Sequence, residues 1–279
     1  MRHKQLFASF MLLVATMLWG LSYSVQSVSA ADMGTYTIVF FKGIGGLFLL
    51  PLIFLFKQHF TKDAVLGGVL IGTCAFMGCA LQQKGIELSG ASKAGFITVL
   101  YIVIVPLIQL IRGEKISRKM IFAILIALVG LYFLCITDRL SFNIGDLYLL
   151  LGAVCFAMQI ILIDHFVQKG DALVLSLVAQ CAVALFSAIL AFSTEVISLS
   201  AVRSAWLPIC FIVFLSGAVA QTIQVVFQKD LEPGLASLLM SFESVFAAIF
   251  GWLLLQQTLT LKEIFGCFLV MIAIIIADE

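Results

Sequence analysis

The stretch Leu253-Leu-Leu-Gln-Gln-Thr-Leu-Thr-Leu-Lys-Glu-Ile-Phe-Gly266 decides the fold, because the chain contains a second version of it. That version, Leu110-Ile-Arg-Gly-Glu-Lys-Ile-Ser-Arg-Lys-Met-Ile-Phe-Ala123, lies 143 positions earlier (253 minus 110). Each is a polar turn between two apolar runs of helix length. Identical residues stand at Leu110/Leu253, Lys119/Lys262, Ile121/Ile264 and Phe122/Phe265. The repetition predicts two copies of one half, over residues 1–137 and 145–279.

The two turns differ in charge. The earlier one carries Arg112, Lys115, Arg118 and Lys119, whereas the later one keeps only Lys262. Lys and Arg are enriched in loops on the cytoplasmic side of a membrane. The two turns should therefore face opposite sides, which follows if each half contains an odd number of membrane spans.

The composition places the chain in a membrane. It has 279 residues, of which 63% are hydrophobic and 11% are charged, whereas a soluble domain carries about 25% charged residues. The net charge of +1 provides no basic face for nucleic acid, so no nucleic-acid partner is expected. We expect a lipid bilayer around the protein, and its function within that bilayer.

Charged and turn-forming clusters divide the chain into ten apolar segments that are long enough to cross a bilayer. We expect spans at 6–29, 35–56, 64–85, 91–111, 119–137, 145–167, 172–194, 205–228, 234–256 and 262–277. The predicted fold class is all-α integral membrane, with ten transmembrane helices arranged as two inverted five-helix repeats.

The distribution of basic residues predicts the orientation. With the N-terminus inside, the inner segments hold Arg2, Lys4, Lys57, Lys62, Arg112, Lys115, Arg118, Lys119, Lys169 and Lys229. The outer segments hold Lys84, Lys93, Arg139, Arg203 and Lys262, and Lys42 lies within a span. Ten against five predicts a multi-pass protein of the cytoplasmic (inner) membrane with both termini cytoplasmic.

Short motifs along the whole chain carry a resemblance to a known family. They are Trp19-Gly20, Lys42, Gly95-Phe-Ile-Thr98 with Pro106, Gly145-Asp146 and Phe242-Glu-Ser-Val245. In this order and spacing the sequence resembles the EamA family of the drug/metabolite transporter (DMT) superfamily. The resemblance implies two inverted repeats, a central substrate cavity and alternating access. The sequence departs from the family pattern at Gln257, where the acid that Glu114 keeps is absent, and at Ser244, where proline is common.

Glu243 lies about ten residues into the ninth span, close to the middle of the membrane. A carboxyl group there costs several kcal/mol unless it is protonated, paired or facing water, which makes it a functional candidate. Three roles are open. It binds a substrate amine, it takes up and releases a coupling proton, or it is a protonated structural donor to a neighbouring helix.

Lys42 lies about seven residues into the second span. One interpretation is that it contacts a substrate carboxylate or forms an ion pair with Glu243. The other, which we favour from sequence, is structural, because a lysine stem can extend toward the interface or bond to backbone carbonyls.

Further polar and aromatic residues within the spans should face inward, because amides and hydroxyls need partners in hydrocarbon. The substrate-binding candidates beside Glu243 are Trp19, Tyr23, Gln82, Thr98, Tyr101, Gln159, Gln224 and Ser241. For each of them, bonding between helices is the alternative role. Pro106 should bend the fourth span, and Gly251 occupies the ninth near the position matching it, so both are candidates for gating.

Enzyme motifs are absent from the sequence, and we expect no enzyme activity, no cofactor and no metal. His3, His59 and His165 lie at span ends rather than together. The leading hypothesis is a secondary transporter for small organic metabolites or drugs, amino-acid-like solutes among them, working by alternating access, in the direction of export and with a proton as a candidate coupling ion. The alternatives are a flippase for lipid-linked substrates and a scaffold or sensor that transports nothing. Substrate, direction, coupling ion and oligomeric state do not follow from the sequence.

Overall fold

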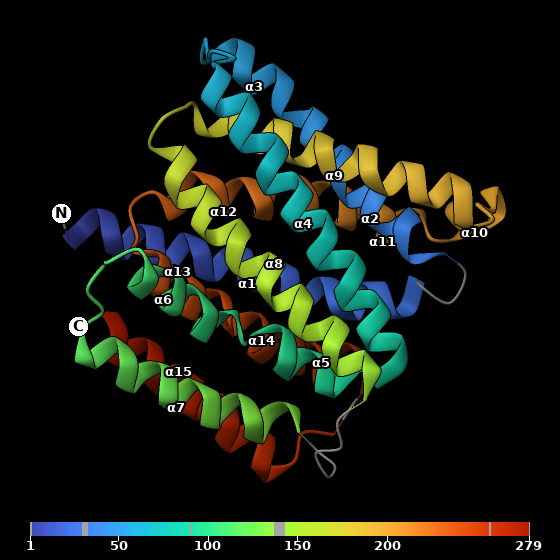
Figure 1. The fold of residues 1–279 in the computed structure, drawn as a ribbon. Coiled ribbons are helices and arrows are strands. Elements are labelled where there is room, and N and C mark those ends of the chain that lie inside the picture. The colour runs from blue at the N-terminus through green and yellow to red at the C-terminus, as the bar shows by residue number, and fades with distance from the viewer. Residues whose placement is uncertain (1, 30–32, 90, 137–142, 257, 279) are drawn as a thin grey trace.

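The computed structural model describes residues 2–29, 33–89, 91–136, 143–256 and 258–278. All regular structure in these ranges is helical (Figure 1). The elements are α1 (Arg2–Ser29), α2 (Thr35–Ile44), η1 (Gly45–Leu49), α3 (Leu50–Leu55), α4 (Lys62–Ser89), α5 (Ala91–Thr98), α6 (Tyr101–Ile111), α7 (Arg118–Cys135), α8 (Ile144–Val167), α9 (Ala172–Thr194), α10 (Leu199–Ser204), α11 (Trp206–Cys210), η2 (Phe211–Ala220), α12 (Gln221–Gln228), α13 (Pro233–Met240), α14 (Phe242–Leu255) and α15 (Leu261–Asp278). η1 is a 3-10 helix and η2 is a π-helix.

Nine helical segments of the described chain are long and apolar enough to cross a membrane. They correspond to the first nine predicted spans, and the all-helical membrane class is confirmed. The tenth predicted span, α15, is different because its 18 residues include Lys262, Glu263 and Asp278. α15 packs along α7. Its crossing of the membrane, and hence the count of ten, stays a prediction.

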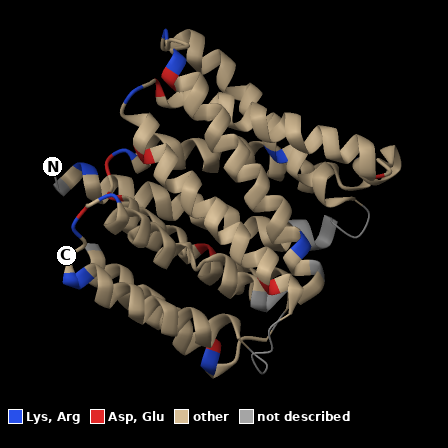
Figure 2. Cartoon of the chain, in the orientation of Figure 1, with Lys and Arg blue, Asp and Glu red and all other residues tan. Residues whose placement is uncertain are grey.

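Local sequence explains where several helices begin. Ser117 precedes α7, and its hydroxyl accepts the Met120 N–H at 3.0 Å. Asn143 and Asp146 form a capping box at the start of α8, and Pro233 opens α13, where its missing N–H costs no helical hydrogen bond. Lys, Arg, Asp and Glu gather mainly at such helix ends (Figure 2), so apolar side chains cover the middle of the bundle.

One end of the bundle holds the start of α1 and the end of α15 (Figure 1). We call it the terminal end, and the opposite one the distal end. Lys262, at the start of α15, donates to the carbonyl of Ile136, just after α7. α7 and α15 are therefore antiparallel, and the Glu114 turn before α7 lies at the terminal end, whereas the turn before α15 lies at the distal end. Gln257 in that turn lies outside the described residues.

Helix packing has the symmetry of the sequence repeat. A shift of 143 positions carries α7 onto α15, since 118 becomes 261 and 135 becomes 278, and it carries α1 into α8 and α6 into α14. α1 packs along α14, η2 and α12, and α8 packs in the equivalent way along α6, α5 and α4. We conclude that the arrangement fits two repeats of opposite direction.

Small residues lie at the closest helix contacts. A Cβ atom at Gly45 would collide with the Val213 carbonyl, and one at Gly217 would collide with the Lys42 carbonyl. These contacts hold the α2 and η1 segment against η2. Gly72 packs in the same way against α9, so these glycines allow close contact between helices.

Two spans are interrupted at equivalent positions. One span breaks between α5 and α6, just after Thr98, and the other breaks at Ser241, between α13 and α14. Ser241 lies 143 positions after Thr98 (241 minus 98). Broken helices at matching positions of two repeats are typical of the binding sites of secondary transporters.

Candidate functional site

Glu243 lies in the first turn of α14, directly after the break at Ser241. The N-terminus of a helix carries unpaired N–H groups and a partial positive charge, which favours a carboxylate there. Glu243 is half-buried and is the eleventh of the 23 residues between Pro233 and Leu255. The break therefore places an acid near the middle of the span, at a position that stabilises its charge.

A chain of hydrogen bonds leads from α4 through α1 to this acid. Gln82 Nε2 donates to the Tyr23 hydroxyl at 3.3 Å, and the Tyr23 hydroxyl is a hydrogen-bond partner of the Glu243 carboxyl. α1 can lie this close to α14 because Gly20 packs directly against Phe246. Three helices thus position one carboxyl group.

Lys42 approaches the same acid from α2. Its ammonium lies over the ring of Trp19, with Nζ 5.6 Å from the ring centroid, and it attracts the Glu243 charge electrostatically. Trp19 is fixed in turn, because its Nε1–H donates to the Ser216 carbonyl in η2 at 3.1 Å. The structure therefore answers a question that the sequence leaves open, since Lys42 and Glu243 face the same site.

Two hydroxyls at the first break are buried and have no partner. Tyr101 is 4% exposed and Thr98 is 4% exposed, and neither hydroxyl forms a hydrogen bond within the described chain. Tyr101 lies close enough to interact electrostatically with Glu243 and Tyr23. An unpaired buried hydroxyl costs about 1–3 kcal/mol, and in a binding site a ligand can supply the missing partner.

The sequence argument missed Cys79. It is half-buried on α4 and lies within electrostatic reach of both Lys42 and Glu243. Its position three residues before Gln82 puts the two side chains on one face of a helix. That spacing is the signal in the sequence that could have identified Cys79.

Other predicted residues lie apart from this cluster. Gln224 donates to Gln228 and to Met240 Sδ, each at 3.3 Å, and Gln228 Nε2 donates to the Ile160 carbonyl at 2.7 Å. This glutamine ladder joins α12 to α8 and α13. Bonding between helices therefore accounts for Gln224.

Ser241 donates to the Leu238 carbonyl of its own helix at 2.7 Å. Gln159 is buried on α8, and none of the described contacts links it to Glu243. Pro106 is buried within α6, several residues after the break that precedes Tyr101, and Gly251 is buried within the continuous part of α14. The spans therefore break at Thr98 and Ser241, while Pro106 and Gly251 lie within helices.

The two sides of Glu243 differ in packing. Every residue of α13, which lies on the terminal side of Glu243, is buried, but only Val245 and Gly251 are buried in α14. Part of the hydrophobic core, including Leu12, Ile102, Leu235 and Leu238, lies on the terminal side. We call this part of the core the closed end.

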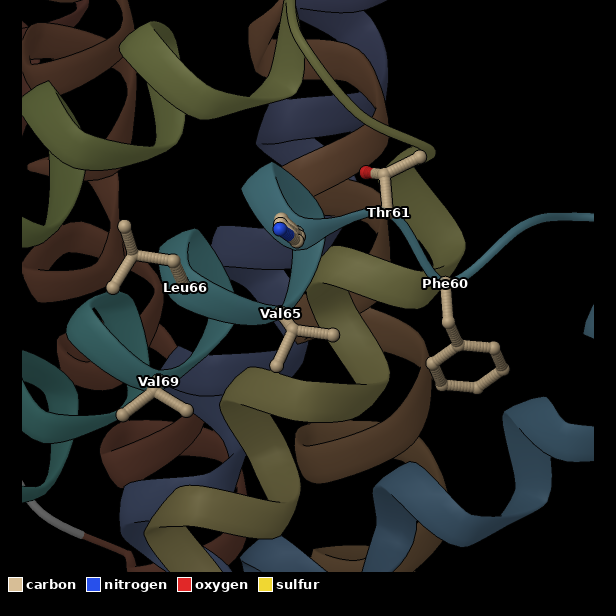
Figure 3. A pocket seen from close by; sticks show the side chains of 6 residues that line it. Phe60, Thr61, Val65, Leu66 and Val69 are labelled. Carbon is tan, nitrogen blue, oxygen red and sulfur yellow. The ribbon is translucent and has the colours of Figure 1, made fainter.

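A surface pocket of about 440 Å³ lies at one end of the bundle (Figure 3). It is lined by Phe60, Thr61, Lys62, Val65, Leu66 and Val69, at the start of α4. Twenty helical residues separate Lys62 from Gln82, which corresponds to about 30 Å. The lining is mostly exposed and apolar, so this pocket is a hollow in the surface and not part of the Glu243 site.

The fold and the site define a multi-pass membrane protein with a polar centre. Comparison with known proteins names its class, because the model of the EamA-like transporter family matches the chain twice, over residues 6–136 and 143–277. The chain belongs to the EamA-like transporter family, and it is a membrane transporter.

Two individual proteins extend this comparison. A protein from Archaeoglobus fulgidus described as an uncharacterized transporter is 30% identical over 280 residues, covering 99% of this chain and 87% of its own. A solved crystal structure is similar with a TM-score of 0.83 at 17% identity, over 97% of this chain and 96% of that one. At that identity the likeness concerns the fold alone.

Proposed function

We propose that the chain is a secondary active transporter that exports small organic metabolites or drugs, amino-acid-like solutes among them, across the cytoplasmic membrane by alternating access. The observation that carries this proposal is the placement of Glu243. It is an acid at the break of a span, hydrogen-bonded to Tyr23, approached by Lys42 and covered on one side by the closed end.

The charges of the site favour a solute that carries an amine. Glu243 offers a carboxylate to an ammonium group, and the rings of Tyr23 and Tyr101 offer apolar surface beside it. A solute that also carries a carboxylate would find Lys42 opposite Glu243. A zwitterion with an apolar body thus fits each group of the site.

Alternating access requires the closed end to open and the distal side to close. In this structure α13 is fully buried on the terminal side of Glu243, so the proposal takes the structure as closed toward the terminal end. If both termini are cytoplasmic, the distal end is the outer one. Glu243 would then release its solute outward and take up a proton in exchange.

Counterflow in liposomes tests the proposal. Purified protein is reconstituted, the liposomes are loaded with a zwitterionic or amine solute, and uptake of the labelled solute is measured. We expect saturable counterflow with wild type, and a loss of at least about hundredfold for Glu243→Gln, because the variant keeps the shape of the side chain but neither charge nor exchangeable proton.

The matched control is Glu114→Gln. Glu114 is an exposed carboxylate paired with Arg112 at 3.7 Å in the turn before α7, so its loss should leave counterflow unchanged. Normal counterflow by Glu243→Gln would contradict the proposal. Movement of labelled lipid in place of the solute would support a flippase, and movement of neither would support a scaffold.

A further inference from the structure

The ammonium of Lys42 already occupies the kind of place that an organic cation prefers. It lies 5.6 Å from the centroid of the Trp19 ring, a distance at which the negative face of an indole attracts a positive charge. The ring cannot turn away freely, because its Nε1–H is bonded to the Ser216 carbonyl. A fixed aromatic face is therefore covered by a cation that belongs to the protein.

Lys42 is held near Glu243 without direct pairing. The two charges attract each other, but within the described part of the chain no carboxylate oxygen lies within 4.0 Å of Lys42 Nζ. Glu243 instead has the Tyr23 hydroxyl as its hydrogen-bond partner. The carboxylate consequently keeps capacity for a second donor, while the cation beside it makes the site neutral as a whole.

This arrangement discriminates by charge. A monovalent organic cation bound at Glu243 would be repelled by the nearby positive charge of Lys42, which weakens its binding. A zwitterion avoids the penalty because its own carboxylate lies toward Lys42. A solute with no amine gains nothing from Glu243.

We infer that Lys42 is the charge-selectivity element of the transporter: by covering the face of Trp19 it excludes organic monocations and admits zwitterions. The inference rests on the proposed function, because it concerns the same site. It assigns a ligand-selecting role to a residue for which the sequence favours a structural one.

Binding measurements on detergent-purified protein test the inference without any transport assay. Four probes share a phenethyl body and differ only in charge. They are the zwitterion phenylalanine, the cation phenethylamine, the anion 3-phenylpropionate and the neutral 2-phenylethanol. Dissociation constants are measured by calorimetry for wild type, Lys42→Met, Glu243→Gln and the matched control Lys42→Arg, which keeps the charge.

Wild type should bind phenylalanine most tightly. In Lys42→Met, phenethylamine should bind at least tenfold more tightly than in wild type and overtake phenylalanine, whereas Lys42→Arg should keep the wild-type order. Glu243→Gln should shift the preference in the opposite direction, toward 3-phenylpropionate. 2-Phenylethanol should change by less than threefold throughout, because it has no charge for either residue to recognise.

Lys42→Met should fold, because Gly217 packs against the backbone carbonyl of Lys42 and not against its side chain. Thermal unfolding checks this, and Lys42→Gln serves as a second neutral variant. The inference is overturned if neither neutral variant binds phenethylamine more tightly, or if none of the probes binds to wild type. A transporter that shows counterflow but no such shift refutes only the inference, whereas charge-dependent binding without counterflow refutes the proposed transport.

Discussion

The two broken spans have the same backbone design but different chemistry. At the second break the first turn of α14 carries Glu243, and at the first break the matching residue, 143 positions earlier, is Leu100. Likewise Tyr101 at the first break stands where the second has Ser244. Each repeat therefore contains one discontinuous span. The break in the second repeat carries the charged residue Glu243, and the break in the first carries Tyr101, an aromatic ring whose hydroxyl has no hydrogen-bond partner among the described residues.

The comparison also separates closure from chemistry. On the terminal side of the breaks, α6 and α13 contribute Ile102, Val105, Leu235 and Leu238 to the closed end. On the distal side, only Val245 and Gly251 of α14 are buried, whereas none of residues 94–98 of α5 is exposed. The two distal parts therefore differ in packing, because α14 is less buried than α5.

The largest expected effect concerns how tightly α5 and α14, on the distal side of the two breaks, pack against their neighbours. A Cβ atom at Gly20 would lie 2.8 Å from the Ala247 nitrogen of α14, so Gly20→Ala should destabilise the fold by about 1–3 kcal/mol. Gly95 of α5 is the control, because a Cβ there meets only Cys135 Sγ, at 3.6 Å. Thermal unfolding in detergent should show a lower Tm for Gly20→Ala alone. An equal loss of Tm in the Gly20 and Gly95 variants would mean that α14 and α5 are packed equally tightly.

The sequence predicted much of this fold and some of the site. Apolar length identified the nine helical segments that are long enough to cross a membrane, and the cost of a carboxyl group in hydrocarbon singled out Glu243. The breaks at Thr98 and Ser241 were not predicted, since neither residue differs in type from residues inside regular helices.

Which side chains lie next to each other was harder to predict than where each residue lies along its span. Lys42 and Glu243 are 201 positions apart (243 minus 42), and their helices pack closely against neighbouring helices at Gly217 and Gly20. Cys79 was missed for the same reason. Gln224 was selected because it is polar, but its place in the glutamine ladder depends on Gln228 and on a backbone carbonyl of another helix.

A smaller effect should distinguish a ligand-binding hydroxyl from a structural one at the first break. Tyr101→Phe removes a buried hydroxyl that has no partner, so the free protein should gain up to about 1 kcal/mol of stability. Affinity for the transported solute should fall about tenfold if the solute satisfies this hydroxyl. Thermal unfolding with and without solute measures both quantities.

Ser244→Ala is the control for Tyr101→Phe, because Ser244 occupies the matching position of the second break and is only half-buried. We expect Ser244→Ala to change the stability of the protein little and its affinity for the transported solute by less than threefold. A loss of stability in Tyr101→Phe, with affinity unchanged, would assign the hydroxyl to the fold.

The smallest effect is expected from a substitution that makes the first broken span resemble the second. Pro106 lies inside α6, where Ile249 stands in the repeat. Pro106→Ile restores an N–H that can bond to the Ile102 carbonyl. The break before Tyr101 should persist, because the second span breaks at Ser241 without any proline. Because α6 should be stiffer in Pro106→Ile, counterflow should be severalfold slower at unchanged solute affinity. That result would support gating by Pro106. An unchanged rate would instead place the flexible point at the breaks themselves.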